Sequence, residues 1–135
     1  MGLLNSFSFQ RLQGGLDAAN KRQSVLANNV ANADTPGFKR SDVSFESVLA
    51  AQESGLKPTL GAKVTDSRHF QFGNVSAVPS AVVSTDETTS MNNNDNNVDM
   101  DREMALSAEN QLRYNSYVQQ LNSQITMMRT VVQGG

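Results

Sequence analysis

Residues 100–132 read MDREMALSAENQLRYNSYVQQLNSQITMMRTVV, a stretch that contains neither Pro nor Gly. Ten positions recur in it at alternating steps of four and three residues: Met100, Met104, Ser107, Gln111, Tyr114, Val118, Leu121, Ile125, Met128 and Val132. Eight of the ten are apolar or aromatic, and their mean spacing of 3.5 residues is typical of a helix seam that packs against a second helix. The stretch therefore predicts one α-helix about 50 Å long.

A second seam of the same period lies near the other end of the chain. Residues 10–33 read QRLQGGLDAANKRQSVLANNVANA, and only Gln23 interrupts the recurrence of apolar side chains. Two seams of one period at opposite ends of a chain predict an antiparallel helix pair. Helices this poor in large apolar residues are marginal alone, so we expect them to need each other or a neighbouring subunit. The expected packing residues are Leu12, Leu16, Leu26 and Val30 against Val118, Leu121, Ile125 and Met128.

The first helix is predicted to end at the turn Thr35-Pro36-Gly37-Phe38. Pro36 keeps the preceding residue out of the helical region, and Pro-Gly suits the two central positions of a type II turn. Three amide side chains precede this turn, namely Asn28, Asn29 and Asn32. Because amides both donate and accept hydrogen bonds, Asn buried between helices fixes their register. On physical grounds alone, a helix end that frays into a turn explains these three residues equally well.

The chain divides by composition into an N-terminal helix with its turn (1–38), an irregular middle region (39–98) and a C-terminal helix (99–135). In the middle region, Asp42 is expected to cap a short helix over 43–52. Short β-prone pieces follow at 62–65 and 80–84, and the Asn-rich stretch 84–97 has little to bury, which predicts a mobile loop. The predicted fold class is mainly α, an antiparallel coiled coil with an irregular, partly β or disordered middle.

Composition excludes much enzyme chemistry. The 135 residues include no Cys and one His, so thiolate sites, disulfides and sites that need two imidazoles are excluded. Aromatic residues are only 6%, while Ser, Asn, Gln and Thr account for 47 residues, so a large core is not expected. The net charge of −2 is too balanced for a nucleic-acid reader. We therefore expect no enzyme activity, no cofactor, no metal, and neither nucleic acid nor a small-molecule substrate as a partner.

Three short motifs have ordinary explanations that we prefer. A calcium loop starting at Asp95 lacks Gly at its sixth position, where Met100 stands, so the acids up to Glu103 are interpreted as a loop and a helix start. His69 lies beside an aromatic residue and needs an unidentified partner to act as a base. Gly2 and the Ser four residues later match a myristoylation pattern that is frequent by chance. Residues 1–6 show no charged start, apolar stretch or cleavage site of a secretory signal, so we expect no cleavable signal.

Motifs at both ends of the chain carry a family resemblance. SVLANNVAN at 24–32, followed by TPGF at 35–38, resembles the N-terminal signature shared by the axial proteins of the bacterial flagellum. NVDMDREMA at 97–105 and ENQLRY at 109–114 resemble one branch, the FlgB family of proximal-rod proteins. SRHF at 67–70 is similar to a short mid-chain motif of that family. Most of 39–98 carries no such motif.

The resemblance implies a structural subunit of the flagellar basal-body rod. Such a subunit leaves the cytoplasm uncleaved through the flagellar type III export apparatus and assembles helically into the rod that crosses the periplasm, where it transmits motor torque. Its implied partners are copies of itself, other rod subunits, the basal adapter protein and the membrane ring. Another rod protein type, or a cytoplasmic coiled-coil adaptor, remains the alternative. The signature residues would set helix register and turn the chain outward: Asn28, Asn29, Asn32, Thr35, Pro36, Gly37 and Phe38.

Overall fold

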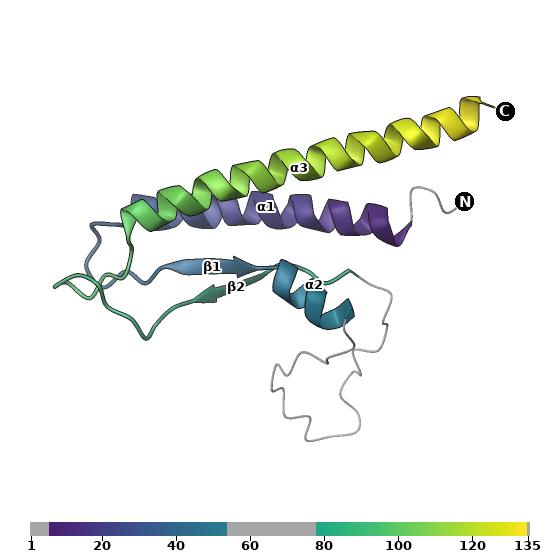
Figure 1. Cartoon of the computed structure of the whole chain (residues 1–135). Coiled ribbons are helices and arrows are strands. Elements are labelled where there is room, and N and C mark those ends of the chain that lie inside the picture. Colours follow the sequence, from purple (N-terminus) through teal and green to yellow (C-terminus); the bar gives the residue numbers. More distant parts are fainter. Residues whose placement is uncertain (1–5, 54–77, 135) are drawn as a thin grey trace, which may run out of the picture.

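The computed structural model of the chain describes residues 6–53 and 78–134. Its elements follow the order α1 (Phe7–Ala31), β1 (Ser41–Ser44), α2 (Glu46–Glu53), β2 (Val82–Thr85) and α3 (Met100–Gln133). Figure 1 shows α1 and α3 side by side and antiparallel, with the start of α1 and the end of α3 at the same end of the pair. The predicted mainly helical fold with paired terminal helices is therefore confirmed.

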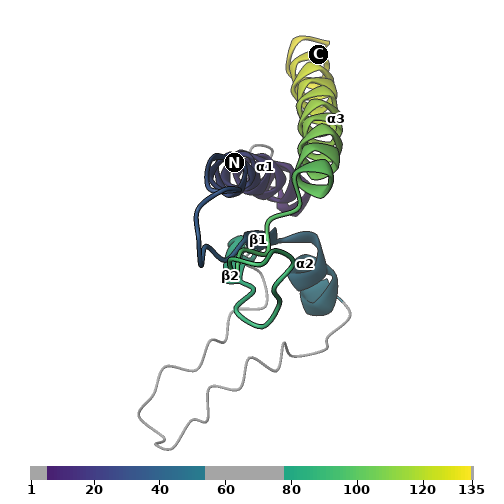
Figure 2. The ribbon, with the colours of Figure 1, turned by 90° about the vertical axis from the view of Figure 1, so that its left-hand side faces the viewer.

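Three layers are visible in both views of the molecule. Figures 1 and 2 place α1 between α3 on one side and the small sheet with α2 on the other. The sheet has two antiparallel strands, in which Ser41 pairs with Thr85 and Val43 pairs with Val83. Seven buried apolar residues form the core of the described part: Leu12, Ala18, Ala19, Leu26, Val43, Phe45 and Val98. Of the described residues of α3, only Glu103 and Asn110 are buried, so α3 itself contributes little apolar burial.

Polar caps fix where the two long helices begin. The Ser6 hydroxyl accepts a hydrogen bond from the backbone N–H of Phe9 at 3.3 Å. The Asp99 carboxylate accepts from the backbone N–H groups of Asp101 and Arg102, at 3.1 and 3.3 Å. These acceptors satisfy backbone donors that have no partner inside a helix, and the acidic first turn of α3 suits the positive end of its dipole.

The turn after α1 has the geometry that the sequence predicted. The N–H of Phe38 donates to the carbonyl of Thr35 at 3.2 Å, and Gly37 has a φ of 72°. A positive φ at the third residue defines a type II turn, and glycine adopts it without steric cost. The chain therefore leaves α1 through a fixed corner and enters β1 along the side of the same helix.

The structure corrects the prediction that Asp42 caps a short helix. Asp42 lies in β1, and α2 begins four residues later, at Glu46. Its carboxylate accepts from the neighbouring N–H of Val43 at 2.8 Å and therefore caps no helix. The reason is non-local, because pairing with residues 82–85 draws 41–44 into a strand and Val43 becomes buried.

The structure anchors the two ends of the predicted loose loop over 84–97, and the mobility of its exposed middle stays a prediction. The stretch starts as part of β2, and at its other end Asn96 and Asn97 are buried, with exposed fractions of 0% and 1%. The amide of Asn96 donates to the carbonyls of Asn32 and Thr35, at 2.9 and 2.8 Å. These hydrogen bonds attach the C-terminal end of the loop to the turn after α1.

Gly15 permits the close approach of α1 and α3. A Cβ atom at this position would lie 2.8 Å from the ring of Tyr117. Replacing Gly15 with Val should therefore lower the free energy of unfolding by about 2 kcal/mol through overpacking. Urea unfolding followed by circular dichroism, in a constant concentration of a stabilising osmolyte, measures the change.

Two further variants separate this steric effect from the general cost of Val in a helix. Ala27→Val, at an exposed position of the same helix, should have a much smaller effect. Adding Tyr117→Ala to Gly15→Val should recover part of the lost stability. Equal losses for Gly15→Val and Ala27→Val would contradict the explanation.

Candidate functional site

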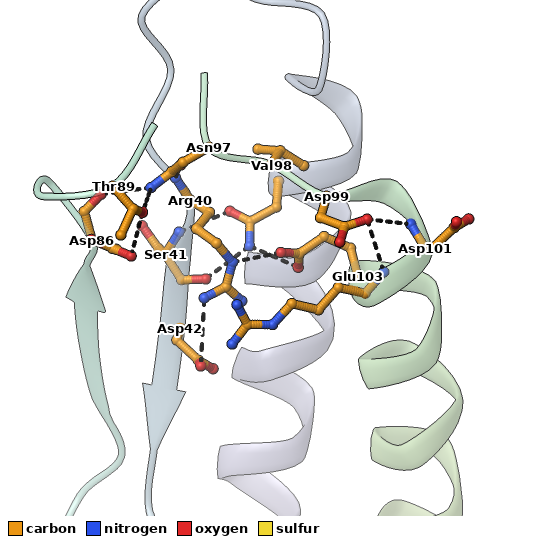
Figure 3. Close-up of polar contacts among 12 residues, drawn as sticks. Arg40, Ser41, Asp42, Asp86, Thr89, Asn97, Val98, Asp99, Asp101 and Glu103 are labelled. Carbon is orange, nitrogen blue, oxygen red and sulfur yellow. Dashed lines mark hydrogen bonds and ion pairs between the residues drawn. The ribbon is translucent and has the colours of Figure 1, made fainter. Parts of the chain in front are cut away.

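A buried ion pair joins the start of α3 to the residue that precedes β1. Nε of Arg40 donates to Oε1 of Glu103 at 2.6 Å, and the two side chains have exposed fractions of 6% and 0%. Figure 3 shows the two groups facing each other, Arg40 from the residue before β1 and Glu103 from α3. Asn29 in α1 donates to the second carboxylate oxygen of Glu103 at 3.1 Å. We call Asn29, Arg40, Asn97 and Glu103 the Glu103 cluster.

The amides of the Glu103 cluster also bind backbone groups. Asn29 donates to the carbonyl of Ser41 at 2.8 Å and accepts from its N–H at 3.0 Å. A neighbouring strand would form the same two kinds of hydrogen bond, and here they fix the end of α1 to β1. Asn97 accepts from the N–H of Arg40 at 2.6 Å and donates to the carbonyl of Asp86 at 2.8 Å. The cluster therefore connects α1, β1, the Asn-rich loop and α3.

The opposite charges of this cluster stabilise each other. Burial alone would lower the pKa of Arg40, but the hydrogen bond and the charge of Glu103 outweigh burial and raise it. At the rim, hydrogen bonds from Thr89 and Thr88 lower the pKa of Asp86 to about 2. Arg40 and Asp86 are therefore charged at neutral pH.

A second polar cluster lies halfway along the helix pair, and we call Arg22, Glu46, Asn110 and Arg113 the Glu46 cluster. Arg22 binds the carboxylate of Glu46 at 2.7 Å, and Arg113 binds its other oxygen at 2.9 Å. Arg22 also donates to the amide oxygen of Asn110 at 3.3 Å, and that amide donates to the carbonyl of Ala19 at 2.9 Å. Burial would raise the pKa of Glu46, but the hydrogen bond from Arg22 leads the interactions that lower it overall.

The side of α3 that faces α1 is a stripe of polar residues seven positions apart. Glu103 contacts Asn29, Asn110 contacts Ala19, Tyr117 lies against Gly15, and Gln124 donates to Ser8. Of the described residues of α3, only Glu103 and Asn110 are buried. This stripe differs from the predicted seam, which followed apolar side chains only. The repeated spacing of seven was the available indication.

The structure places the predicted packing residues at different depths in the single chain. Leu12 and Leu26 are buried, whereas Leu16 and Val30 are half-buried. On α3, the half-buried residues are Val118, Leu121 and Met128, while Ile125 is 38% exposed. Their role in contacts between subunits stays a prediction.

The predicted signature residues also differ in how deeply they are buried. Asn29 is buried in the Glu103 cluster, whereas Asn32 is half-buried and its amide donates to Asn28 on the helix surface. Phe38 is half-buried, and four members are exposed: Asn28, Thr35, Pro36 and Gly37. An assembly role for this motif stays a prediction.

The other candidate motifs gain no support from the geometry. Asn97 and Glu103, which fall in the calcium-like series, are engaged in the Glu103 cluster. Within residues 6–53 and 78–134, no group of three or more His, Asp or Glu side chains is arranged to hold a metal ion. His69, the SRHF motif, the piece at 62–65 and Gly2 lie outside the described residues. No helix in the described part is long and apolar enough to cross a membrane.

Comparison with known proteins identifies the class and then the family. Residues 9–39, which contain most of α1 and the turn after it, match the family model of the flagella basal body rod protein. The chain is 39% identical over 132 residues to the flagellar basal body rod protein FlgB of Bacillus subtilis (strain 168), covering 98% of both chains. It is 37% identical to the FlgB protein of Proteus mirabilis (strain HI4320), covering 98% of this chain and 97% of that one.

A third relative, the FlgB protein of Salmonella typhimurium, is 36% identical over 126 residues and covers 91% of each chain. The chain therefore belongs to the FlgB family of flagellar basal body rod proteins. The predicted family is confirmed, and within the rod proteins the FlgB type is the one identified.

Removing the negative charge of Glu103 should be severely destabilising. In Glu103→Gln, buried Arg40 loses its closest countercharge and keeps only the exposed carboxylate of Asp42 at 3.8 Å. Loss of one partner of a buried pair costs about 3–5 kcal/mol. Urea unfolding in a constant concentration of osmolyte measures the loss. The matched control is Glu109→Gln, because Glu109 pairs with Arg113 on the surface and such pairs contribute only about 0.5 kcal/mol. If Glu103→Gln lowers the free energy of unfolding no more than the control does, the Glu103 cluster does not have the predicted effect on stability.

The Glu46 cluster should make stability depend on pH. The folded chain lowers the pKa of Glu46 below the ordinary value of a Glu side chain. This stabilisation is therefore complete at pH values above that ordinary pKa and is lost as the pH falls through and below it. We expect Glu46→Gln to be less stable than wild type at neutral pH, and the difference to shrink in acid. Urea midpoints of both proteins at several pH values test this. A difference that does not change with pH would disprove it.

Proposed function

We propose that this chain is a structural subunit of the proximal part of the flagellar rod. On this proposal, it is exported uncleaved through the flagellar type III apparatus and assembles helically to transmit motor torque. Its neighbours are copies of itself, other rod subunits, the basal adapter protein and the membrane ring. Membership of the FlgB family supports the rod and the subunit role.

The observation that carries the proposal is the incomplete burial of α3. Of its 34 residues, the two buried ones are polar, whereas seven large apolar side chains are exposed: Met100, Met104, Leu112, Ile125, Met127, Val131 and Val132. Exposed apolar surface of this extent is typical of a protein that completes its packing against other chains. A subunit of a continuous rod has such neighbours along its length.

The same feature supports export in an unfolded state. A chain with only seven buried apolar residues in its described part gains little free energy from folding alone. Association then supplies the remaining burial, so folding and assembly are coupled. A head-to-tail contact that does not close on itself generates a helical filament, which is the geometry of a rod.

Fractionation tests the proposal directly. A tagged copy, expressed in a flagellated bacterium that lacks its own FlgB, should restore swimming and purify with isolated basal bodies. A variant that lacks residues 26–38, expressed at the same level, should do neither, because it loses the turn and the Asn29 anchor. Recovery of the tagged wild-type chain only in the soluble cytoplasmic fraction would contradict the proposal and favour a coiled-coil adaptor.

A further inference from the structure

The hydrogen-bond ladder between β1 and β2 is incomplete at the pair Arg40 and Asp86. Ser41 pairs with Thr85, so the antiparallel register places Arg40 opposite Asp86. The N–H of Asp86 donates to the carbonyl of Arg40 at 3.0 Å, which is one of the two hydrogen bonds that such a pair can form. In the second, the N–H of Arg40 would donate to the carbonyl of Asp86. Both of these groups bind the Asn97 side chain instead.

The Asn97 amide takes the place of that second hydrogen bond. Its oxygen accepts from the N–H of Arg40 at 2.6 Å, and its nitrogen donates to the carbonyl of Asp86 at 2.8 Å. The same nitrogen donates to Oγ1 of Thr89 at 3.0 Å. Figure 3 places Asn97 beside Arg40 and Thr89, at the end of the strand pair. A carboxamide fits this position because it carries an acceptor and two donors on one planar group.

Asn97 is held in this position by both of its neighbours. The amide nitrogen of Asn96 donates to two backbone carbonyls at the end of α1, and its oxygen accepts from the N–H of Val98 at 2.7 Å. All three residues of 96–98 are buried. Two residues after Asn97, Asp99 caps α3. A displacement of Asn97 would therefore also move the start of α3.

The spacing that the amide imposes suits the ion pair beside it. On the other edge of β1, Asn29 binds both backbone groups of Ser41, so the strand is held from two sides. Direct pairing of Arg40 with Asp86 would close a gap as wide as the amide group. The Nε atom of Arg40 lies 2.6 Å from Glu103, and a charged hydrogen bond of that length leaves little room for such a shift.

We propose that Asn97 is a latch with two positions, and that its insertion between Arg40 and Asp86 positions Arg40 for Glu103. Inserted, the amide keeps the strands apart at this pair and holds the start of α3 on the sheet. Withdrawn, it lets the two strands pair directly, so Arg40 leaves Glu103 and the first turns of α3 detach while the sheet remains. The latch operates within a single chain, so it does not depend on the proposed function.

Replacing Asn97 with Asp tests the amide directly. An ionised carboxylate still accepts from the N–H of Arg40 but has no proton for the carbonyl of Asp86, whereas a protonated carboxyl donates to it. Three charged groups surround the position: Arg40 favours the ionised form, while Glu103 and the Asp86 carboxylate oppose it. Because Arg40 is already paired with Glu103, we expect the pKa of the new carboxyl to lie above that of an ordinary Asp. Stability lost at neutral pH then returns as the pH falls through this raised pKa.

Urea midpoints of the full chain, in a constant concentration of osmolyte, measure this effect. Asn97→Asp should unfold at lower urea than wild type at neutral pH, and roughly half of this deficit should disappear by about pH 5. The matched control is Asn93→Asp, which adds the same charge at an exposed position of the same loop and should show no such recovery. A deficit of Asn97→Asp that stays constant or grows in acid overturns the latch. So does failure of this variant to fold at both pH values.

Hydrogen exchange in Asn97→Ala separates a latch from a general loss of stability. The backbone amides of residues 103–107, at the start of α3, should exchange about tenfold faster than in wild type. The amides of Asp42 and Ser84, which the register places between the strands, should keep their protection. Equal acceleration in the strands and in α3, or none in either, would show that Asn97 does not have two positions.

Discussion

The buried ion pair between Arg40 and Glu103 is the constraint on which the rest of the structure depends. Glu103 is inaccessible to solvent, so its charge is tolerated only where Arg40 and Asn29 meet it. This requirement fixes the first turn of α3 against the last turns of α1 and against β1 at once. The turn after α1 also supports this ion pair, because it places Arg40 opposite Glu103 within a few residues of the end of α1. Asn97 then holds the backbone of Arg40 from the opposite side.

Polar contacts of this kind specify an arrangement more than they stabilise it. The described part of the chain buries as many polar or charged residues as apolar ones, seven of each. A buried ion pair recovers in attraction roughly what it loses in desolvation, so its net contribution to stability is small. What it provides is register, because a helix displaced by one residue would leave a charge buried and unpaired. The helix pair is therefore well defined although little apolar surface holds it together.

The sequence predicted the features that depend on neighbouring residues and missed those that depend on distant ones. The two long helices and the turn at Pro36 and Gly37 follow from local periodicity and backbone preferences. The strand at Ser41–Ser44 does not, because its partner lies about 40 residues further along the chain. The polar stripe of α3 was missed for a related reason. Glu103 and Asn110 are ordinary surface residues by type, and only the arrangement of Arg40, Asn29 and Arg22 makes their burial favourable.

The two ends of α3 are packed differently, and this difference bears on assembly. Its first half is fixed to the rest of the chain by the two polar clusters, whereas its last three turns carry mostly exposed apolar side chains. A helix anchored at one end and unpacked at the other presents that second end in a defined direction. The direction is set by the register that Glu103 and Asn110 impose. The buried polar residues, which contribute little to net stability, therefore orient the exposed apolar residues at the far end of α3.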